Sequence, residues 1–517
     1  MVKFVTAKEA AACIPDQATM LIEGFIGSGV ADEVHEAIGE RFEQEGHPKQ
    51  VTLIHAAGIG DANHKGMNYY AHEGMVKRII GGHWAMAPQL HALVEDNKIE
   101  AYNFPQGVIS QMTRDASAHR PYFITNVGVD TFVDPIHNGG KLNEKATEDL
   151  VQRIEIEGEP YLAYKTFKPN VAILRGSYAD ERGNISFEDE PLTLEATSEA
   201  MAAKNNGGIV IVQVKEKVKD GTLNPKMVKI PSVLVDYVVV VQNHDHHKQT
   251  YNTHYNEALL SSDLKYIHEE NEAIPLTIRK IIGRRASLFL PDDAKVVNYG
   301  IGMPEMVAKV FKEEGLHHRF MNTVEPGTFG GAALSGMDFG TALAPEAVID
   351  QPYMFDFYDG GGIDITFLGM AECDENGNIN VSKFSHRIAG AGGFINISQN
   401  TPIVVFCGTF MAGSLKMAIA DDELVIEQEG KNEKFVPEVS HVTFSGTAAR
   451  RKGQQVYYVT ERAVFKLVDE GIELIEVAPG IDIQHDVLDH MGFTPKISDH
   501  VTTMDERIFK EALMHLA

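Results

Sequence analysis

Two kinds of hydrophobic pattern alternate along this chain. Short runs rich in β-branched residues, such as 233–241, have the length and composition of buried strands. Between such runs lie segments such as 31–38, where the apolar residues recur at helical spacing. Strands that alternate with helices are typical of βαβ units. The pattern therefore predicts an α/β fold with open, largely parallel sheets.

The sequence also repeats itself. Residues 15–24 match 291–300, and both segments are an apolar strand that runs into glycine. Residues 180–185 match 374–379, and both have the Asp, Gly and Asn residues of a tight turn. Repeats of this kind indicate structural units of common origin.

The repeats predict two related domains from an internal duplication. We place the domains at 1–270 and 271–517, with the boundary in the polar stretch 262–272. A chain of 517 residues with 44% hydrophobic residues is long enough to build two cores.

Net charge and cysteine content limit the partners and the cellular compartment that we expect for this protein. The formal net charge of -27 argues against nucleic acid or an anionic membrane surface as a partner. Three widely spaced cysteines do not form a disulfide framework and favour a reducing compartment. Residues 1–9 lack a signal-peptide pattern, and no apolar run reaches membrane-spanning length. We therefore expect a cytoplasmic protein.

Each half begins with a glycine loop between a strand and a helix, at 24–29 and at 300–304. In open parallel sheets such loops are places where ligands bind. Turns of this kind need glycine even when they bind nothing, so one loop alone is weak support for a site. The spacing of the first loop does not fit the dinucleotide-binding fingerprint, which argues against a Rossmann cofactor site.

Glu325 is the most informative carboxylate. It follows the β-branched pair Thr323-Val324 and precedes Pro326-Gly327, which predicts a strand end that enters a tight turn. The glycine-rich segment 390–394 allows close approach of the backbone and can direct N–H groups at a developing oxyanion, although a simple bend between strands is the alternative.

Together these segments resemble a family I coenzyme A transferase with its two subunits fused. The resemblance covers essentially the whole chain and is greatest to the propionate/acetate type. The matching segments are 324–327, 390–394, 104–107, 355–362, 377–384, 406–410 and the two glycine loops. The first loop departs from the usual family pattern after Phe25, which puts any ligand contact there in doubt.

The resemblance implies a covalent mechanism. Glu325 would be the nucleophile that attacks an acyl-CoA thioester and later carries CoA as a glutamyl thioester. The side-chain amide of Gln106 and a backbone N–H of Gly392 or Gly393 would stabilise the oxyanion. By residue type alone, the simpler interpretation of Gln106 is a turn residue after Pro105. In the short alignment of the two halves, Ala56 stands opposite Glu325, so only the second half would carry the nucleophile.

The resemblance also implies where CoA binds. The candidate CoA-binding residues are Gly300, Ile301, Gly302, Met303 and Lys416. The loop precedes a predicted helix, whose N-terminal N–H groups favour anions. An ordinary surface lysine is the alternative interpretation of Lys416.

The expected activity is CoA transfer between short-chain acyl-CoA and free acids such as acetate, propionate, butyrate or lactate. Coenzyme A would be a substrate, with no permanently bound cofactor, and family members suggest a homo-oligomer, commonly a homotetramer. An acyl-CoA hydrolase or a small-ligand sensor on the same fold remain alternatives. The histidine-rich segment 243–247 is interpreted as a solvated loop, and no metal is expected.

Overall fold

The computed structural model describes residues 2–267, 274–384 and 387–516. The chain forms two compact units. Of the described residues, the first combines 2–267 with 324–356 and 387–396, and the second comprises 274–323, 357–384 and 397–516. The division at 270/271 expected from the repeats falls outside the described residues and stays a prediction. The segment that carries Glu325 belongs to the first compact unit, although it lies in the second sequence half.

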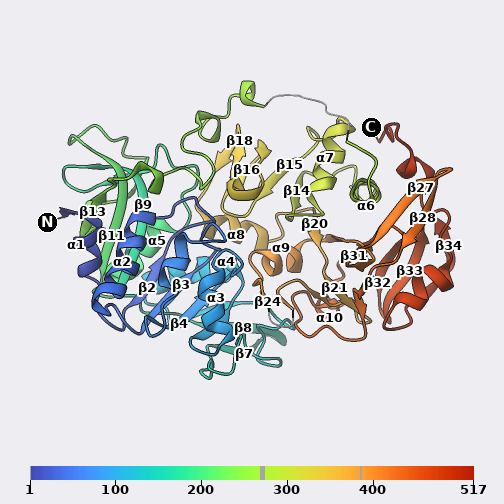
Figure 1. The fold of residues 1–517 in the computed structure, drawn as a ribbon, viewed down its shortest axis with the longest axis horizontal. Helices are drawn as coiled ribbons and strands as arrows, with labels where there is room; N and C mark the ends of the chain where they lie inside the picture. Colours follow the sequence, from blue (N-terminus) through green and yellow to red (C-terminus); the bar gives the residue numbers. More distant parts are fainter. Residues whose placement is uncertain (1, 268–273, 385–386, 517) are drawn as a thin grey trace. The chain divides into compact units, whose positions relative to one another are not determined.

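The first unit is built on a parallel sheet (Figure 1). The strand order is β1-β13-β11-β9-β2-β3-β4-β5, and all neighbours in this path run parallel. These strands span Lys3–Val5 (β1), Thr19–Ile22 (β2), Val51–His55 (β3), Val76–Gly81 (β4), Glu100–Asn103 (β5), Val171–Asp180 (β9), Ile209–Val218 (β11) and Tyr237–Val240 (β13).

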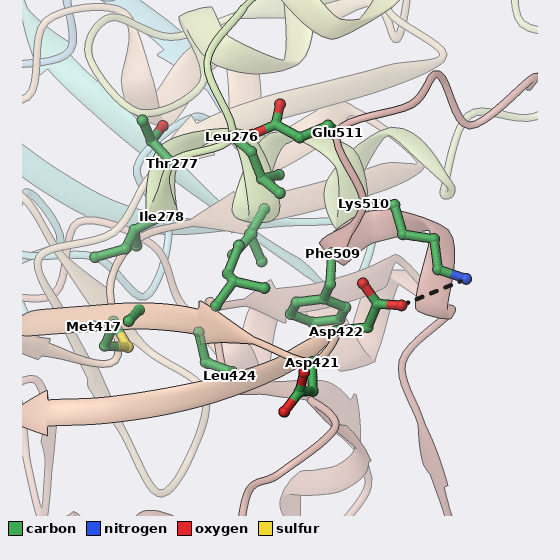
Figure 2. A pocket seen from close by; sticks show the side chains of 13 residues that line it. Leu276, Thr277, Ile278, Met417, Asp421, Asp422, Leu424, Phe509, Lys510 and Glu511 are labelled. Atoms are coloured by element: carbon green, nitrogen blue, oxygen red, sulfur yellow. Dashed lines mark ion pairs between the residues drawn. The ribbon is translucent and has the colours of Figure 1, made fainter.

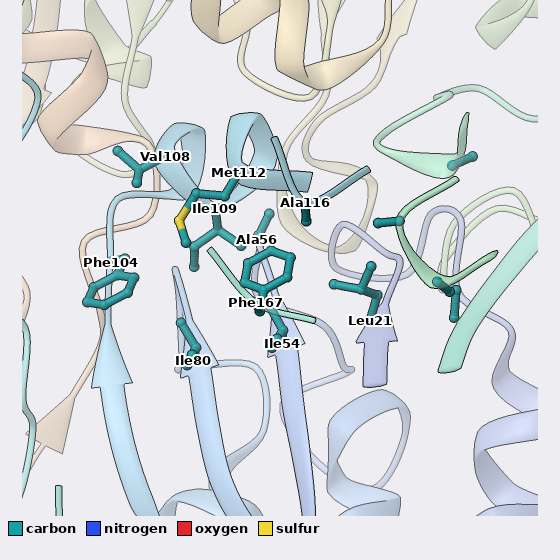
Figure 3. Close-up of a cluster of buried hydrophobic side chains, with 14 of the residues drawn as sticks. Leu21, Ile54, Ala56, Ile80, Phe104, Val108, Ile109, Met112, Ala116 and Phe167 are labelled. Carbon is teal, nitrogen blue, oxygen red and sulfur yellow. The ribbon is translucent and has the colours of Figure 1, made fainter. Parts of the chain in front are cut away.

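Helices cover both faces of this sheet. They span Ala7–Ala12 (α1), Asp32–Glu45 (α2), Pro88–Glu95 (α3), Gln106–Ser117 (α4) and Ala196–Asn205 (α5). One buried cluster packs α4 and α5 on the sheet, and another packs α1, α2 and α3. Figure 3 shows Ile109 and Met112 of α4 beside Ile54 and Ile80 of the strands. This packing fixes the start of α4 at the carboxyl ends of β4 and β5.

Smaller strands complete the first unit. β6 (Tyr122–Thr125), β7 (Val151–Ile156) and β8 (Glu159–Lys165) form an antiparallel sheet. Short antiparallel pairs are made by β10 (Ile185–Ser186) with β12 (Val228–Ile230), β16 (Thr328–Phe329) with β19 (Ala347–Val348), and β17 (Ala332–Ala333) with β18 (Ala342–Leu343).

The second unit has a mixed sheet with the order β15-β14-β20-β25-β31-β32-β33-β34. Its members from β15 to β31 are parallel, and β31, β32 and β33 are antiparallel neighbours. The strands span Val296–Tyr299 (β14), Met321–Val324 (β15), Ile365–Gly369 (β20), Ile403–Cys407 (β25), Gln455–Val459 (β31), Ala463–Val468 (β32), Gly471–Val477 (β33) and Lys496–Thr503 (β34).

Helices and short strands surround this sheet. The helices are α6 (Ile278–Ser287), α7 (Glu305–Glu313) and α10 (Gly446–Lys452), and the chain also forms α8 (Gln351–Asp359) and α9 (Phe394–Asn400). The minor strands are β21 (Glu372–Asp374), β22 (Ile379–Asn380), β23 (Lys383–Phe384), β24 (Arg387–Ile388), β26 (Met411–Ala412), β27 (Lys416–Ala420), β28 (Glu423–Gln428), β29 (Asn432–Glu433) and β30 (Phe435–Val436).

The two repeated turns have the same hydrogen bonds. The Asp180 carboxylate accepts from the Asn184 N–H at 2.9 Å and from the Asn184 side-chain amide at 2.7 Å. The Asp374 carboxylate accepts from the Asn378 N–H at 3.0 Å and from its side-chain amide at 2.9 Å. The strand order β3-β2-β9-β11-β13 of the first unit also matches β15-β14-β20-β25-β31 of the second. These shared features support an internal duplication.

The local predictions hold in part. Residues 31–38 lie at the start of α2, as the helical spacing indicates. In the predicted strand 233–241, only Tyr237–Val240 is a strand, and Val233 is 75% exposed in a single 3-10 turn. A β-branched run predicts local strand preference, but pairing begins only where a neighbour, here β11, is present.

Candidate functional site

Glu325 lies at the end of β15, in the tight turn that the sequence predicts. The Gly327 N–H donates to the Val324 carbonyl at 3.1 Å, and the Ile349 N–H donates to the Gly327 carbonyl at 2.9 Å. Gly327 has φ +126°, and a Cβ there would stand 1.9 Å from the Ile349 carbonyl oxygen. Only glycine fits this position. The turn holds the Glu325 backbone in place.

The Glu325 carboxyl titrates near neutrality. Its residue is half-buried, and burial raises the pKa of the carboxyl to about 7. Ala56 directly follows β3 as Glu325 directly follows β15, which agrees with the short alignment of the two halves. The first copy therefore has a methyl group where the second has a carboxylate.

A dense set of hydrogen bonds fixes the glycine-rich segment 390–394 within the first unit. The Asn103 side chain is central to it. Its amide donates to the carbonyls of Gly81 and Gly82, each at 2.7 Å, and its carbonyl accepts from the Ala391 N–H at 3.0 Å. The Trp84 N–H donates to the Ala389 carbonyl at 2.8 Å. The last residues of β4 and β5, together with Gly82 and Trp84 after β4, thus hold this loop at the start of α4.

The same network distinguishes Gly392 from Gly393, the two glycines whose backbone N–H was predicted to stabilise an oxyanion. The Gly392 N–H donates to the Gly82 carbonyl at 2.8 Å, and the Gly392 carbonyl accepts from the Gln106 N–H at 2.9 Å. Among the hydrogen bonds of the described residues, none uses the Gly393 N–H. A Cβ at Gly392 would lie 3.6 Å from the His83 ring and 3.8 Å from Gln106 Oε1. Gln106 and the glycine turn therefore border the same space.

The Gln106 side chain is buried and takes part in a chain of hydrogen bonds. Its Nε2 donates to Gln351 Oε1 at 3.2 Å, and Gln351 Nε2 donates to the Glu195 carboxylate. Burial raises the pKa of Glu195 to about 7, while the Ser110 hydroxyl and the Gln351 amide act in the opposite direction. Gln106 therefore has a defined side-chain environment, unlike an ordinary turn residue.

Glu195 belongs to a group of buried carboxyls. Burial and the neighbouring Glu195 raise the pKa of Glu199 well above its ordinary value. Burial and Glu199 likewise raise the pKa of Glu23. Because these acids are close enough to interact, they cannot all be ionised at neutral pH without a large cost.

Sequence reasoning missed Asn103, Gln351 and Glu195. Gln351 lies 245 residues from Gln106 along the chain, so no local pattern connects them. Asn103 could have been noticed as a polar residue at the end of an apolar strand, three positions before Gln106. Its contacts with Gly81 and Ala391 depend on the fold.

The predicted CoA-binding loop lies in the second unit, between β14 and α7. Gly302 has φ +83° with open space on its side-chain face, and Ile301 is 58% exposed. The Gly302 N–H donates to the Glu305 carboxylate at 3.0 Å, and the Arg279 guanidinium donates to the Gly302 carbonyl. An anion at this helix N-terminus must therefore displace the Glu305 carboxylate.

Lys416 begins β27 and is exposed. The next residue, Met417, lines a cavity of about 490 Å³ in the second unit, between the start of α6, the β27–β28 hairpin and residues 509–511 (Figure 2). Asp421 and Asp422 border this cavity. The acidic border is unfavourable for phosphate groups inside the cavity.

The histidine-rich segment 243–247 is the predicted solvated loop at its first three residues, which are exposed, and the prediction is wrong for His247. His247 is 8% exposed, its Nε2 lies 3.5 Å from the Glu190 carboxylate, and burial lowers its pKa to about 4. It is a buried side chain because Gln213 and Glu190 pack against it. In the part of the chain that the structure describes, no group of three or more His, Cys, Asp or Glu residues is arranged to hold a metal ion. No helix there is long and apolar enough to cross a membrane.

Comparison with known proteins gives a consistent result. Residues 4–241 match the sequence model of the family described as "Coenzyme A transferase". The chain is 43% identical to acetate CoA-transferase YdiF of Escherichia coli O157:H7 over 515 residues, which cover 99% of this chain and 96% of that protein. It is 46% identical to caffeate CoA-transferase of Acetobacterium woodii over 516 residues, with 99% and 98% covered.

Solved structures agree with these sequence matches. The crystal structure of the acyl-CoA transferase YdiF apoenzyme from E. coli O157:H7 superimposes with a TM-score of 0.93 at 42% identity, covering 100% of this chain and 98% of that chain. A thioester complex of the same enzyme with CoA superimposes with a TM-score of 0.92 at 42% identity and the same coverage.

Proposed function

The chain belongs to the family I coenzyme A transferases, with both halves fused in one polypeptide, and on this basis we propose that it transfers CoA between short-chain acyl-CoA and free carboxylates through a glutamyl-CoA thioester at Glu325. The observation that carries the proposal is the setting of Glu325. Its carboxyl has a pKa of about 7, and a glycine turn holds it in place. A related enzyme has been crystallised as a thioester complex with CoA.

The reaction follows from this carboxylate. Ionised Glu325 attacks the thioester carbonyl, and the CoA thiolate leaves as a mixed anhydride forms. The thiolate then attacks the glutamyl carbonyl, which releases the donor acid and leaves CoA bound to Glu325 as a thioester. An acceptor carboxylate reverses both steps. Partial burial makes Glu325 less solvated than a surface glutamate, which favours attack once the proton has gone.

Each addition produces an oxyanion that needs hydrogen-bond donors. We assign this role to Gln106 Nε2 and to the Gly393 N–H, because the Gly392 N–H is already bound to the Gly82 carbonyl. The segment 349–351 links the two parts of the site. Ile349 binds the Glu325 turn at Gly327, and Gln351 binds the Gln106 amide.

CoA recognition is assigned to the second unit. We propose that the loop Gly300 to Met303 and Lys416 contact the phosphates of CoA, which is bound as a substrate only. Exposed Ile301 and open Gly302 leave the loop accessible. Replacing Lys416 with alanine should raise the KM for acetyl-CoA and leave the KM for acetate unchanged. An equal change in both constants would contradict the assignment.

The acids are proposed to be short aliphatic carboxylates such as acetate, propionate, butyrate and lactate. The similarity to an acetate enzyme supports this choice, while the similarity to a caffeate enzyme makes an aromatic acid the alternative. Competition of these four acids and caffeate for CoA from one acyl-CoA donor would rank them directly. Assembly into a homo-oligomer is part of the same proposal and rests on the family resemblance. A cytoplasmic location is also proposed, and it rests on the three widely spaced cysteines and on the sequence of residues 1–9.

The central test compares Glu325→Ala with Glu346→Ala, an exposed glutamate of the same segment. Exchange of labelled acetate into acetyl-CoA should fall to background in Glu325→Ala and stay at the wild-type rate in Glu346→Ala. Thiol release without an acceptor acid measures hydrolysis in the same samples. Exchange by Glu325→Ala at the wild-type rate would refute the proposal, and thiol release as fast as exchange would identify a hydrolase.

A further inference from the structure

Two large apolar residues have a backbone conformation that normally favours glycine. Ile26 has φ +55° and Leu194 has φ +43°. Among the described non-glycine residues with positive φ, only these two have a large apolar side chain. The conformation is unfavourable for such residues because the Cβ atom crowds the backbone, and it persists only where the surrounding structure enforces it. Strained residues of this kind cluster at ligand sites, so their surroundings are informative.

Both residues belong to one small apolar cluster. The Ile26 N–H donates to the Gly58 carbonyl at 2.7 Å, and the Ile26 carbonyl accepts from the Gly60 N–H at 3.0 Å. These two hydrogen bonds hold Ile26 in its strained conformation. The buried members of the cluster are Phe25, Ala57, Leu192 and Leu194, and Ile26, Phe339 and Val348 pack against them.

The residue before Ile26 packs beside the Glu325 turn. A Cβ at Gly340 would stand 2.6 Å from the Phe25 ring and 2.9 Å from Pro326 Cγ. The side chains of Phe25 and Pro326 therefore border the same glycine. Because Pro326 directly follows Glu325, the loop that carries Ile26 lies next to the turn of the proposed nucleophile.

Ile26 is also connected to the glycine-rich turn of the site. Its hydrogen-bond partner Gly58 lies against His83, since a Cβ at Gly58 would stand 2.5 Å from His83 Nδ1. The His83 ring in turn borders Gly392, where a Cβ would lie 3.6 Å from it. Phe25 and Ile26 are therefore linked by contacts to both turns of the proposed site.

Ile26 has the exposed surface that a ligand contact needs. In the stretch 20–32, which the structure describes throughout, Ile26 is half-buried and every other residue is buried. Pockets for apolar groups are lined by hydrophobic side chains of this kind. The strained backbone thus presents one apolar side chain from a loop that is otherwise covered.

We propose that Ile26 is a specificity-determining residue that limits the length of the aliphatic acyl chain during CoA transfer. This inference deepens the proposed function and rests on it, because it assumes that the acyl group is bound beside Glu325. Carbons near the carboxyl group fit in front of Ile26, whereas those of a longer chain meet its side chain. The bonds to Gly58 and Gly60 prevent Ile26 from giving way.

The test compares acids of increasing length as acceptors of CoA from acetyl-CoA. In the wild type, kcat/KM should fall at least about 10-fold from butyrate to hexanoate, since two more methylenes do not fit. In Ile26→Gly, the ratio of kcat/KM for hexanoate to that for acetate should rise at least about 10-fold, because glycine removes the side chain and suits the left-handed conformation. Ile26→Ala should raise this ratio by a smaller factor.

Glu157→Gly is the matched control. Glu157 has φ +54° and is exposed in the turn between β7 and β8. The substitution relieves the same kind of backbone strain outside the glycine loop. It should leave the hexanoate-to-acetate ratio within about 2-fold of the wild type. Thermal melting curves of the three variants identify any that fail to fold.

Three results would overturn the inference. One is an unchanged ratio in folded Ile26→Gly and Ile26→Ala, and another is an equal rise in Glu157→Gly. The third needs no variant, and it is a wild type that uses hexanoate as well as acetate. Failure of the proposed function is a separate result, in which the wild type transfers CoA to none of the acids or Glu325→Ala retains exchange.

Discussion

Replacing Glu325 with glutamine should stabilise the protein, and the gain should grow with pH. Burial raises the pKa of this carboxyl from 4.5 to about 7. The folded state therefore holds the proton more tightly than the unfolded state. Between these two pH values the wild type loses stability as the pH rises, because the unfolded chain releases its proton first. Glutamine has no such proton.

The magnitude follows from the pKa. Each tenfold change in proton affinity corresponds to about 1.4 kcal/mol. Above pH 7, Glu325→Gln should therefore raise the free energy of unfolding by at most about 3 kcal/mol relative to the wild type. For a unit of roughly 300 residues, this corresponds to a rise in melting temperature of about 5 °C at most. Near pH 4.5 the difference should vanish, since Glu325 is then neutral in the folded protein and half-neutral in the unfolded chain.

The measurement is thermal unfolding of Glu325→Gln and wild type across pH 4.5 to 8.5. Glu73→Gln is a matched control, since its side chain is 69% exposed. The control should follow the wild type at every pH to within about a degree. A difference for Glu325→Gln that stays constant with pH, or one that shrinks as the pH rises, would refute a carboxyl whose pKa is raised by burial.

Other expectations concern rate and folding. Because attack requires ionised Glu325, kcat/KM should rise with pH and level off above about 7, and an acid limb near pH 4.5 would contradict the raised pKa. Glu325→Asp should lower kcat at least about 100-fold, since it retracts the carboxylate by one methylene. An exchange rate near that of the wild type would show that the length of this side chain is unimportant. Gly327→Ala should lower the melting temperature by several degrees, because its Cβ meets the Ile349 carbonyl oxygen, and an unchanged melting curve would show that this turn can relax.

Much of the fold could be predicted from the sequence because its determinants are local. The Asp, Gly and Asn residues of 180–185 and 374–379 specify a turn by their own hydrogen bonds, and both turns form. The turn at Glu325 follows from Pro326 and Gly327 in the same way. In each case the residues that determine the structure are neighbours in the chain.

The remaining features depend on contacts between distant residues. The sequence could not show that the Gly392 N–H is already bound, because its partner is the Gly82 carbonyl, about 300 positions earlier. It also could not place Gln351 beside Gln106, since the two come from different sequence halves. We predicted an exposed His247, and this prediction was wrong for the same reason, because Glu190 and Gln213 enclose the side chain.

The most direct test of the account is mass spectrometry after incubation with acetyl-CoA alone. The protein is treated with borohydride, digested and mapped, with Glu325→Ala processed in parallel. The account predicts a CoA adduct, or a glutamate reduced to the alcohol, at position 325 of the wild type and no modification in Glu325→Ala. An adduct on another carboxylate, or an unmodified wild-type protein that exchanges acetate at full rate, would contradict it.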